Sequence, residues 1–330
     1  MSRQSLSSVV SLLKRFLQVY WLKPFDAVND TANAWALRQF PWEEPILEIG
    51  GGDGVFSFIM HGGELIPADD RYDQSAPGRS GDIFDVYDKD LPLTIKRRAA
   101  RKYLATVDLK RSHLRKCKET QLYRLQVASP PEPLPFAGGV FKTVFLYFPH
   151  GMAERDEVLD YGRILMEIRR VIRADGALLM TAMNRRIADC FVCYPLHRFF
   201  ERSGWPRLSA YFKRLDSGRY QEISGAGYTL ERWMRLLNDA GFRLTDGWAQ
   251  VTPLAWRVYD FQTRPILRPL IRWSWLLRRA HLKKAVKAIW VYVWLPVLTL
   301  FYIVFAKPGR FSVGLKSRSA VFFVFRAIPT

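Results

Sequence analysis

The chain has 330 residues, of which 49% are apolar, 14% aromatic and 25% charged. This composition is typical of a globular protein and excludes a disordered or collagen-like chain, and three cysteines are too few for a disulfide-stapled secreted scaffold. The two ends of the chain supply 17 of the 19 net positive charges. Residues 1–25 contain four basic and no acidic residues, and the part after Asp260 contains thirteen Lys or Arg and no acid. The sequence therefore describes a nearly neutral domain with basic, apolar ends.

Residues 1–24 are predicted to form an amphipathic helix that Pro24 ends. Apolar residues recur there at the spacing of one helix face: Leu6, Val9, Val10, Leu13, Phe16, Leu17 and Tyr20. Lys14 and Arg15 accompany this face. Two interpretations stay open: the helix packs on the domain, or it lies on an anionic membrane surface.

A short buried strand, a glycine-rich turn and a helix start are predicted between Pro45 and Met60. The turn and the acid before it supply candidate ligand-binding residues: Glu48, Gly50, Gly51, Gly52, Asp53 and Gly54. Alternate glycines let the backbone fold tightly against a ligand, amides at a helix N-terminus face a carboxylate, and the acid can hold an ammonium group. This set favours an amino-acid moiety, because a dinucleotide motif would have glycine where Val55 stands. An ordinary tight turn is the alternative.

The centre of the chain alternates between strand-like and helical segments. Strands are predicted at 103–108, 143–148 and 177–181, and helices at 110–120, 156–173 and 230–240. Such alternation indicates an α/β fold with a mostly parallel sheet. Two irregular stretches, 61–102 and 185–228, interrupt it, and we expect 185–228 to form a lid over the substrate.

The C-terminal region combines basic residues with a long apolar stretch. Eight Lys or Arg between Arg264 and Lys287 precede residues 288–306, which carry no charge. A helix of that length measures about 28 Å, close to the thickness of a bilayer core. Trp290, Tyr292, Trp294 and Tyr302 suit the headgroup boundary.

The segment Ser319–Ala327 limits what the apolar stretch can do. If this segment is the last strand of the sheet, the chain must return to the side it left, which excludes one full crossing by 288–306. Two crossings of about ten residues each would be too short. We therefore expect an interfacial or re-entrant hairpin bent at Pro296. A single span without that strand, or a buried helix of a soluble core, are the alternatives.

Several segments together resemble the class I S-adenosylmethionine-dependent methyltransferases, whose first motif reads Leu-Glu-Ile-Gly-x-Gly-x-Gly. The matching segments are Leu47–Gly54, Val107-Asp108-Leu109, Pro133–Phe136, Glu167–Gly176 and Tyr228–Phe242. The resemblance covers about residues 40–250. It implies a Rossmann-like sheet flanked by helices and S-adenosyl-L-methionine as the cofactor.

The same resemblance implies roles for residues at the end of the family's second strand and just before its Leu-Pro-Phe loop. Asp108 would bind the ribose hydroxyls, with Leu109 and Ser129 beside the cofactor. Asp69 and Asp70 lie about twenty residues past Gly50 and are alternatives for the ribose, but the strand-like residues before Asp108 favour it.

The sequence offers one candidate catalytic residue and no complete metal site. His150 follows a predicted strand at the ligand-binding edge and is the candidate base, although a loop histidine is an alternative. Cys190 and Cys193 have the spacing of half a zinc site, but no second half follows, so no metal is expected. Lys142 stands where the family usually has an acid, which keeps an inactive methyltransferase-fold scaffold open.

We therefore expect an N-terminal helix at 1–24, a cofactor-binding domain at 25–260, a basic and apolar membrane-associated segment at 261–318 and a last strand within 319–330. The predicted activity is methyl transfer to a lipid, isoprenoid or lipid-linked saccharide at the cytoplasmic face of a membrane. Its partner would be an anionic membrane surface rather than a nucleic acid, because the basic residues adjoin long apolar stretches. A soluble small-molecule or glycan O-methyltransferase with an apolar dimer interface and an inactive scaffold are the alternatives. The sequence leaves the oligomeric state open.

Overall fold

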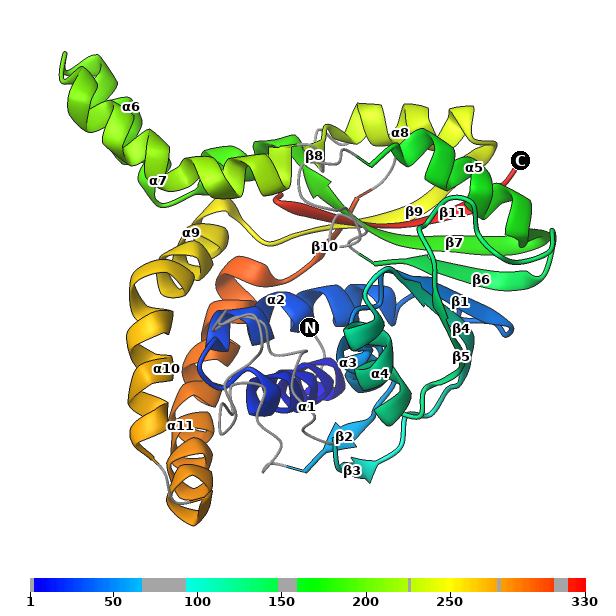
Figure 1. The fold of residues 1–330 in the computed structure, drawn as a ribbon, viewed down its shortest axis with the longest axis horizontal. Helices are drawn as coiled ribbons and strands as arrows, with labels where there is room; N and C mark the ends of the chain where they lie inside the picture. Colours follow the sequence, from blue (N-terminus) through cyan, green and yellow to red (C-terminus); the bar gives the residue numbers. More distant parts are fainter. Residues whose placement is uncertain (1–2, 67–92, 148–158, 225–226, 278–279, 312–319) are drawn as a thin grey trace.

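A computed structural model describes residues 3–66, 93–147, 159–224, 227–277, 280–311 and 320–330, and its centre is one large sheet (Figure 1). The strands run in the order β10-β9-β11-β7-β6-β1-β4-β5, and β8 pairs with β7 outside this path. Their bounds are β1 Ile46–Ile49, β4 Tyr103–Asp108, β5 Tyr123–Ala128, β6 Phe141–Leu146, β7 Ile172–Asn184, β8 Gly227–Tyr228, β9 Phe242–Gln250, β10 Gly309–Phe311 and β11 Phe322–Pro329. A separate pair, β2 Glu64–Leu65 and β3 Ile95–Arg97, lies beyond the sheet.

The sheet is parallel except near its last strand. β1 pairs in parallel with β4 and β6, and β6 with β7, whereas β11 runs antiparallel between β7 and β9. A Rossmann-like parallel sheet with a late antiparallel strand is the arrangement expected from the resemblance to class I methyltransferases. The predicted fold class is confirmed.

Four helices connect the parallel strands: α3 Val55–Met60, α4 Arg111–Glu119, α5 Tyr161–Val171 and α8 Leu230–Asp239. Side-chain caps fix the starts of two of them. The Asp160 carboxylate accepts hydrogen bonds from two amides of α5, and the Thr229 hydroxyl accepts one from the Arg232 amide of α8. Helices α5 and α8 contribute to one apolar core with β1, β6 and β7, and a second core lies between α3 and the N-terminal part of the chain.

The N-terminal helices α1 Arg3–Val19 and α2 Pro24–Leu37 pack against the sheet domain. The apolar face of α1 is buried: Val9, Leu13, Phe16 and Leu17 have no exposed surface. Phe16 stacks on Phe56 of α3, with ring centroids 5.8 Å apart. The structure therefore supports the first of the two interpretations: the helix packs on the domain.

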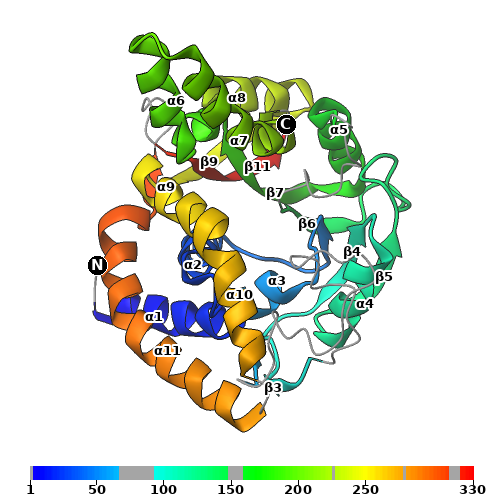
Figure 2. The same ribbon diagram turned by 60° about the vertical axis from the view of Figure 1, so that its left-hand side comes forward.

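Two helical insertions leave the carboxyl edge of the parallel strands and return to it. The first, after β7, contains the 3-10 helix η2 Arg185–Cys190, α6 Cys193–Arg202 and α7 Pro206–Ser224. The second, between β9 and β10, contains α9 Pro253–Phe261, η3 Gln262–Ile266, α10 Leu267–Leu276, α11 Ala280–Phe301 and η4 Tyr302–Ala306. The Thr252 amide donates to the Phe305 carbonyl at 3.1 Å, which joins the two ends of this insertion. Figure 2 brings both insertions forward.

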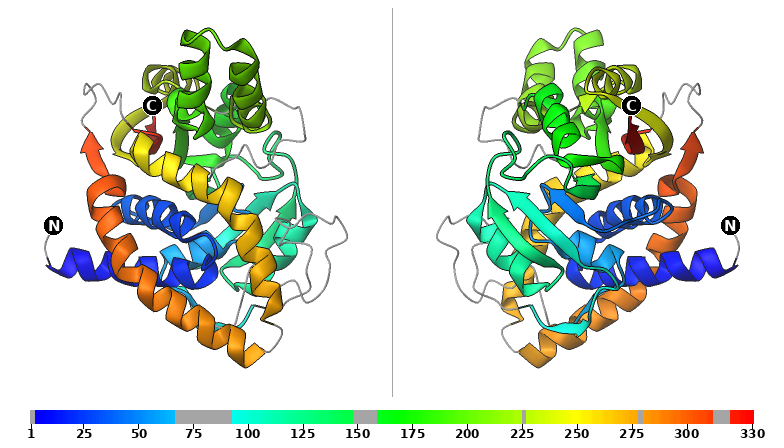
Figure 3. Two further views of the ribbon diagram at one scale, coloured as in Figure 1. Left: turned by 90° about the vertical axis from the view of Figure 1, so that its left-hand side faces the viewer. Right: turned by 90° about the vertical axis from the view of Figure 1, so that its right-hand side faces the viewer.

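The predicted hairpin does not turn at Pro296. Helix α11 continues through Pro296 to Phe301 and into the π-helical turn η4. A proline inside a helix removes one backbone hydrogen bond, but here the packing of the inner face of α11 keeps the helix intact. Helices α10 and α11, on either side of residues 278–279, form a V (Figure 3).

Candidate active site

The glycine turn connects the end of β1 to the start of α3. The Gly50 amide donates to the Val107 carbonyl of β4 at 2.9 Å, and the Gly54 amide donates to the Gly51 carbonyl at 2.9 Å. Gly54 has φ +72°, and a Cβ there would lie 2.8 Å from both Cys117 Sγ and the Tyr123 ring. Only glycine fits this position, because both the backbone conformation and the space exclude a side chain.

Glu48 lies beneath this turn with no exposed surface. Ser57 Oγ donates to its Oε1 at 2.7 Å, and the Tyr123 hydroxyl donates to Oε2. Burial raises the pKa of Glu48 to about 7, against the effect of these two hydrogen bonds. A Cβ on Gly51 would lie 2.9 Å from the Glu48 carboxyl carbon, so the backbone of the turn rests directly on the acid.

Asp108 ends β4 next to the glycine turn, because Val107 pairs with Ile49 of β1. Its carboxylate is 2% exposed and accepts a hydrogen bond from the Lys110 amide at 2.8 Å, and its other oxygen lies 3.2 Å from His113 Nδ1. A carboxylate accepts about four hydrogen bonds, so further acceptor capacity remains for hydroxyl groups. The acid therefore stands at the edge where open α/β sheets bind ligands.

The remaining predicted cofactor residues join the same edge. Asp53 Oδ1 accepts from the Val55 amide at 3.2 Å and helps to start α3. Leu109 is partly exposed beside Asp108. The Ser129 amide donates to the Asp108 carbonyl at 3.3 Å, which brings the end of β5 to the site. The structure thus assembles all of these residues around the ends of β1, β4 and β5.

His150 and the alternative acids Asp69 and Asp70 lie outside the described residues. A polar pair that the sequence did not indicate lies at the end of β6: the Tyr147 hydroxyl is 3.3 Å from Asp30 Oδ1 of α2. Burial, followed by the charge of Asp30, raises the pKa of Tyr147 well above its usual value. Tyr147 is therefore a neutral hydrogen-bonding group at this edge and not a base.

Sequence reasoning also missed Ser57, Tyr123 and His113, the direct partners of the two acids. Tyr123 is 75 positions from Glu48 in the sequence. It reaches the acid across β4, because β5 lies only two strands from β1 in the sheet. Within the described residues, no group of three or more His, Cys, Asp or Glu side chains could hold a metal ion.

One departure from the family motifs, Lys142, lies away from the site. Lys142 is at the amino end of β6, where its Nζ is 2.7 Å from Asp175 Oδ2. The segment Glu167–Gly176 holds the Pro133–Phe136 loop: Glu167 accepts from the Leu134 amide at 2.9 Å, and Arg170 donates to the Phe136 carbonyl at 2.7 Å. Lys142 therefore does not obstruct the carboxyl edge.

No family model and no curated protein matches the chain. Among solved structures, it is similar to a methyltransferase from Thermotoga maritima described as a possible histamine N-methyltransferase, with 10% identity, a TM-score of 0.49 and coverage of 94% of this chain and 92% of that one. It is also similar to S-adenosylmethionine-dependent methyltransferases in complex with S-adenosyl-L-homocysteine. The one from Thiobacillus denitrificans has 8% identity and a TM-score of 0.40, and the match covers 100% of this chain and 92% of that one. The one from Geobacter sulfurreducens has 10% identity and a TM-score of 0.39, and the match covers 92% of this chain and 90% of that one.

Proposed function

We propose that the protein is an S-adenosylmethionine-dependent methyltransferase that acts on a lipid, isoprenoid or lipid-linked saccharide at a membrane surface. The observation that carries the cofactor assignment is the meeting of the glycine turn with Asp108 at the carboxyl edge. The turn leaves no room for side chains at Gly51 or Gly54, so its backbone amides are the groups that a ligand would contact. Asp108 would hold the ribose hydroxyls.

When bound, the cofactor supplies an electrophilic methyl group on a sulfonium. The residues of this chain then contribute mainly position, since orientation of the reacting atoms can account for most of the acceleration of such a transfer. Glu48, Ser57 and Tyr123 hold the turn in place from below. For a hydroxyl acceptor, His150 or Asp30 would accept the proton, and Tyr147 would orient Asp30.

The membrane assignment rests on where apolar side chains are exposed. Among described residues, every exposed large apolar side chain except Leu125 and Met166 belongs to one of the two insertions at the carboxyl edge. Helix His281–Ala306 is the described helix long and apolar enough to span a membrane, yet only 17% of its most apolar window is buried. An apolar surface of this extent on the side of the cofactor turn favours a lipid acceptor.

Helix α11 would lie at the membrane interface rather than cross it alone. Its inner face, with Val291, Leu298 and Tyr302, packs on the domain, and the helix contacts α1 and α2. Its outer face exposes apolar residues along one line: Ile289, Tyr292, Val293, Val297, Leu300 and Val304. A helix buried on one side and apolar on the other suits a monotopic attachment, with the V of α10 and α11 reaching toward the lipid.

The cofactor assignment is tested by calorimetric titration of the protein with S-adenosylmethionine, in detergent and without it. We expect micromolar binding by the wild type and at least about a tenfold loss in Asp108→Asn. Asp175→Asn, at the opposite edge of the sheet, is the matched control and should bind as the wild type does. No binding by folded wild type would overturn the enzyme assignment and favour an inactive scaffold.

The acceptor is tested by incubating the protein with labelled S-adenosylmethionine and a total lipid extract. Label that enters the organic phase, and that Asp108→Asn lowers, supports the lipid acceptor. Label found only in water-soluble products, from a protein that is a stable dimer without detergent, would instead support the soluble O-methyltransferase. Binding of the cofactor with no turnover on either fraction would support the scaffold.

A further inference from the structure

A cavity lies away from the cofactor turn. Its volume is about 380 Å³, within the range of small-ligand sites. It is formed by the middle of α1, the residue after α2, the loop after α3 and the end of β3. Its lining includes two serines and four arginines: Ser8, Ser11, Arg15, Arg38, Arg97 and Arg98. The cavity meets α3 at His61 and Gly62, the end opposite the glycine turn, so it is a separate site.

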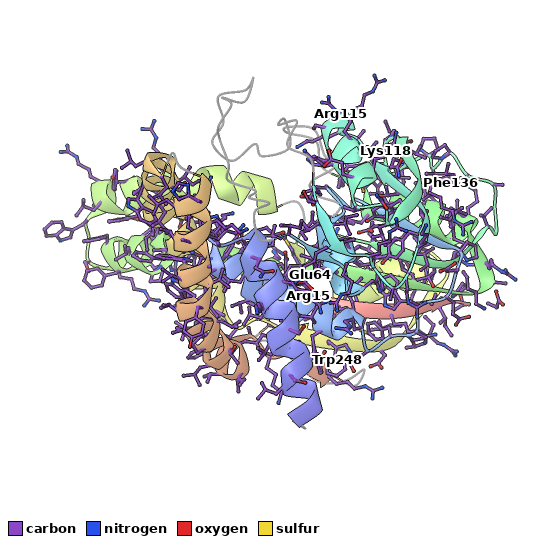
Figure 4. The ribbon with its side chains drawn as sticks, turned by 90° about the horizontal axis from the view of Figure 1, so that it is seen from below. Arg15, Glu64, Arg115, Lys118, Phe136 and Trp248 are labelled. Carbon is purple, nitrogen blue, oxygen red and sulfur yellow. The ribbon has the colours of Figure 1, made fainter. Side chains whose placement is uncertain are left out.

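Four arginines face this one cavity, and the nearby acid is already engaged. Glu64 lies 2.7 Å from Lys96 Nζ and 3.8 Å from Arg97 Nη2. Within the described residues, no carboxylate forms an ion pair with Arg15, Arg38 or Arg98. Figure 4, seen from below, shows Arg15 of α1 beside Glu64 of β2.

The arginines repel one another in a partly enclosed space. Partial burial, and then the neighbouring charge of Arg97, lower the pKa of Arg15. His61, whose Nε2 is 2.7 Å from the Tyr103 hydroxyl, adds no charge, because burial and the nearby Arg101 and Arg38 lower its pKa to about 3. The positive charge of the cavity is therefore carried by guanidinium groups, and a bound anion would relieve their repulsion.

The donors match one kind of anion. Guanidinium groups present planar pairs of N–H donors that fit phosphate oxygens, and they stay charged at every physiological pH. Arg15 Nη2 donates to Ser11 Oγ at 3.0 Å, and this contact fixes the side chain on α1. The hydroxyls of Ser8 and Ser11 add short polar groups at the wall of the cavity. A carboxylate ligand would use fewer of these donors than a phosphate or diphosphate.

We propose that this cavity is a binding site for a phosphate group, supplied either by an anionic phospholipid or by a free phosphate-bearing molecule. The cavity is independent of the proposed methyl transfer. Strand β3, which forms one wall of the cavity, lies at the same end of the molecule as the junction of α10 and α11, the lower end in Figures 1 and 2. A lipid headgroup in the cavity would therefore hold the molecule in the orientation that the V of α10 and α11 requires.

Two measurements on the full chain distinguish the sources. The first titrates inorganic pyrophosphate by calorimetry at constant ionic strength. The second measures sedimentation with vesicles of phosphatidylcholine alone or containing phosphatidylglycerol. Free phosphate as the ligand predicts saturable pyrophosphate binding and no preference for anionic vesicles. A phospholipid headgroup predicts a preference for anionic vesicles that pyrophosphate reduces by competition.

The variants are Arg15→Gln/Arg38→Gln and, since Arg38 and Arg98 are exposed, Arg38→Gln/Arg98→Gln as a pair that should fold normally. The matched control is Arg115→Gln/Lys118→Gln, which removes two exposed charges from α4 (Figure 4). We expect both cavity variants to lose about tenfold or more in affinity, while the control and the affinity for S-adenosylmethionine stay unchanged. The proposal is overturned if the wild type binds neither probe, or if the control loses as much affinity as the cavity variants.

Discussion

Helices α1 and α11 both have sequences that suit a membrane surface, yet the structure treats them differently. The apolar residues of α1 form one face, and the domain buries the centre of that face, from Val9 to Leu17. From Ala288 onward, helix α11 is apolar around its circumference, so one face suffices to pack on α1 and α2 and the other remains exposed. Periodicity in α1 thus matches a single buried face, whereas uniform apolarity in α11 leaves a surface that the chain itself does not cover.

The largest expected effect comes from placing a charge on each helix. Phe16→Asp buries an unpaired carboxylate in the core of the molecule and should destabilise the fold by about 4 kcal/mol or more. Val293→Asp, on the exposed face of α11, should change the free energy of unfolding by about 1 kcal/mol or less and weaken binding to vesicles. Urea unfolding and vesicle sedimentation measure the two properties. Equal destabilisation by both variants would contradict the difference between the helices.

The two faces of α11 can be compared by one substitution at neighbouring positions. Leu298 has no exposed surface, and Leu300 is 64% exposed. Leu298→Ala should leave a cavity and cost about 2–5 kcal/mol, whereas Leu300→Ala should cost about 0.5 kcal/mol or less in urea unfolding. In vesicle sedimentation the order should reverse, with Leu300→Ala the weaker binder. If Leu300→Ala cost as much stability as Leu298→Ala, another copy of the chain would cover this face in solution.

The contrast between buried and exposed groups extends to an ionisable side chain, Glu48. Burial raises its pKa to about 7 from 4.5, so the folded state binds the proton more tightly than the unfolded state. The resulting stability is complete below about pH 4.5 and is lost as the pH rises through about 7. At about 1.4 kcal/mol per pH unit, the loss amounts to about 3 kcal/mol.

Glu48→Gln removes this titration, because the amide stays neutral. The wild type should lose stability relative to the variant between pH 5 and pH 8, measured by urea unfolding at both values. Glu167→Gln, at a partly exposed acid of α5, is the control. Hydrogen bonds from Arg170 lower the pKa of Glu167, so this carboxylate is charged at both pH values. The difference in stability between the wild type and Glu167→Gln should therefore be the same at pH 5 and pH 8. A constant difference between wild type and Glu48→Gln at both pH values would argue against a proton on Glu48.

The sequence predicted the parts of the site that are local in the chain. The glycine turn, its preceding acid and the strand 103–108 are contiguous motifs, and the structure has β4 at Tyr103–Asp108. Strand β5 was not predicted, because it lies at the sheet edge and five of its six residues are at least partly exposed without a regular alternation. The contact of Tyr123 with Glu48 consequently could not be foreseen, since it depends on the order of strands in the sheet.

The place of the hairpin turn also depended on tertiary packing. Pro296 is the one proline in 288–306 and indicated the turn of the hairpin, but α11 continues through it. Phe25 of α2 contacts Trp294 before the proline and Phe301 after it, so the helix packs on the domain on both sides of Pro296. Likewise, the periodicity of α1 was compatible with either the domain or a membrane. Only the position of the surrounding helices decides which surface covers an apolar face.

The smallest predicted effect concerns two tyrosines of the same helical segment. Tyr302 is fully buried, and its hydroxyl has no hydrogen-bond partner among the described residues, whereas Tyr292 is 81% exposed. Tyr302→Phe removes a buried polar group without a bond, so the free energy of unfolding should stay the same or rise by about 1 kcal/mol. Tyr292→Phe should change it by only a few tenths. A loss of stability in Tyr302→Phe would mean that the hydroxyl is bonded, for example to water or a lipid group between α11 and the domain. The inner face of α11 would then be a wet contact, unlike the covered face of α1.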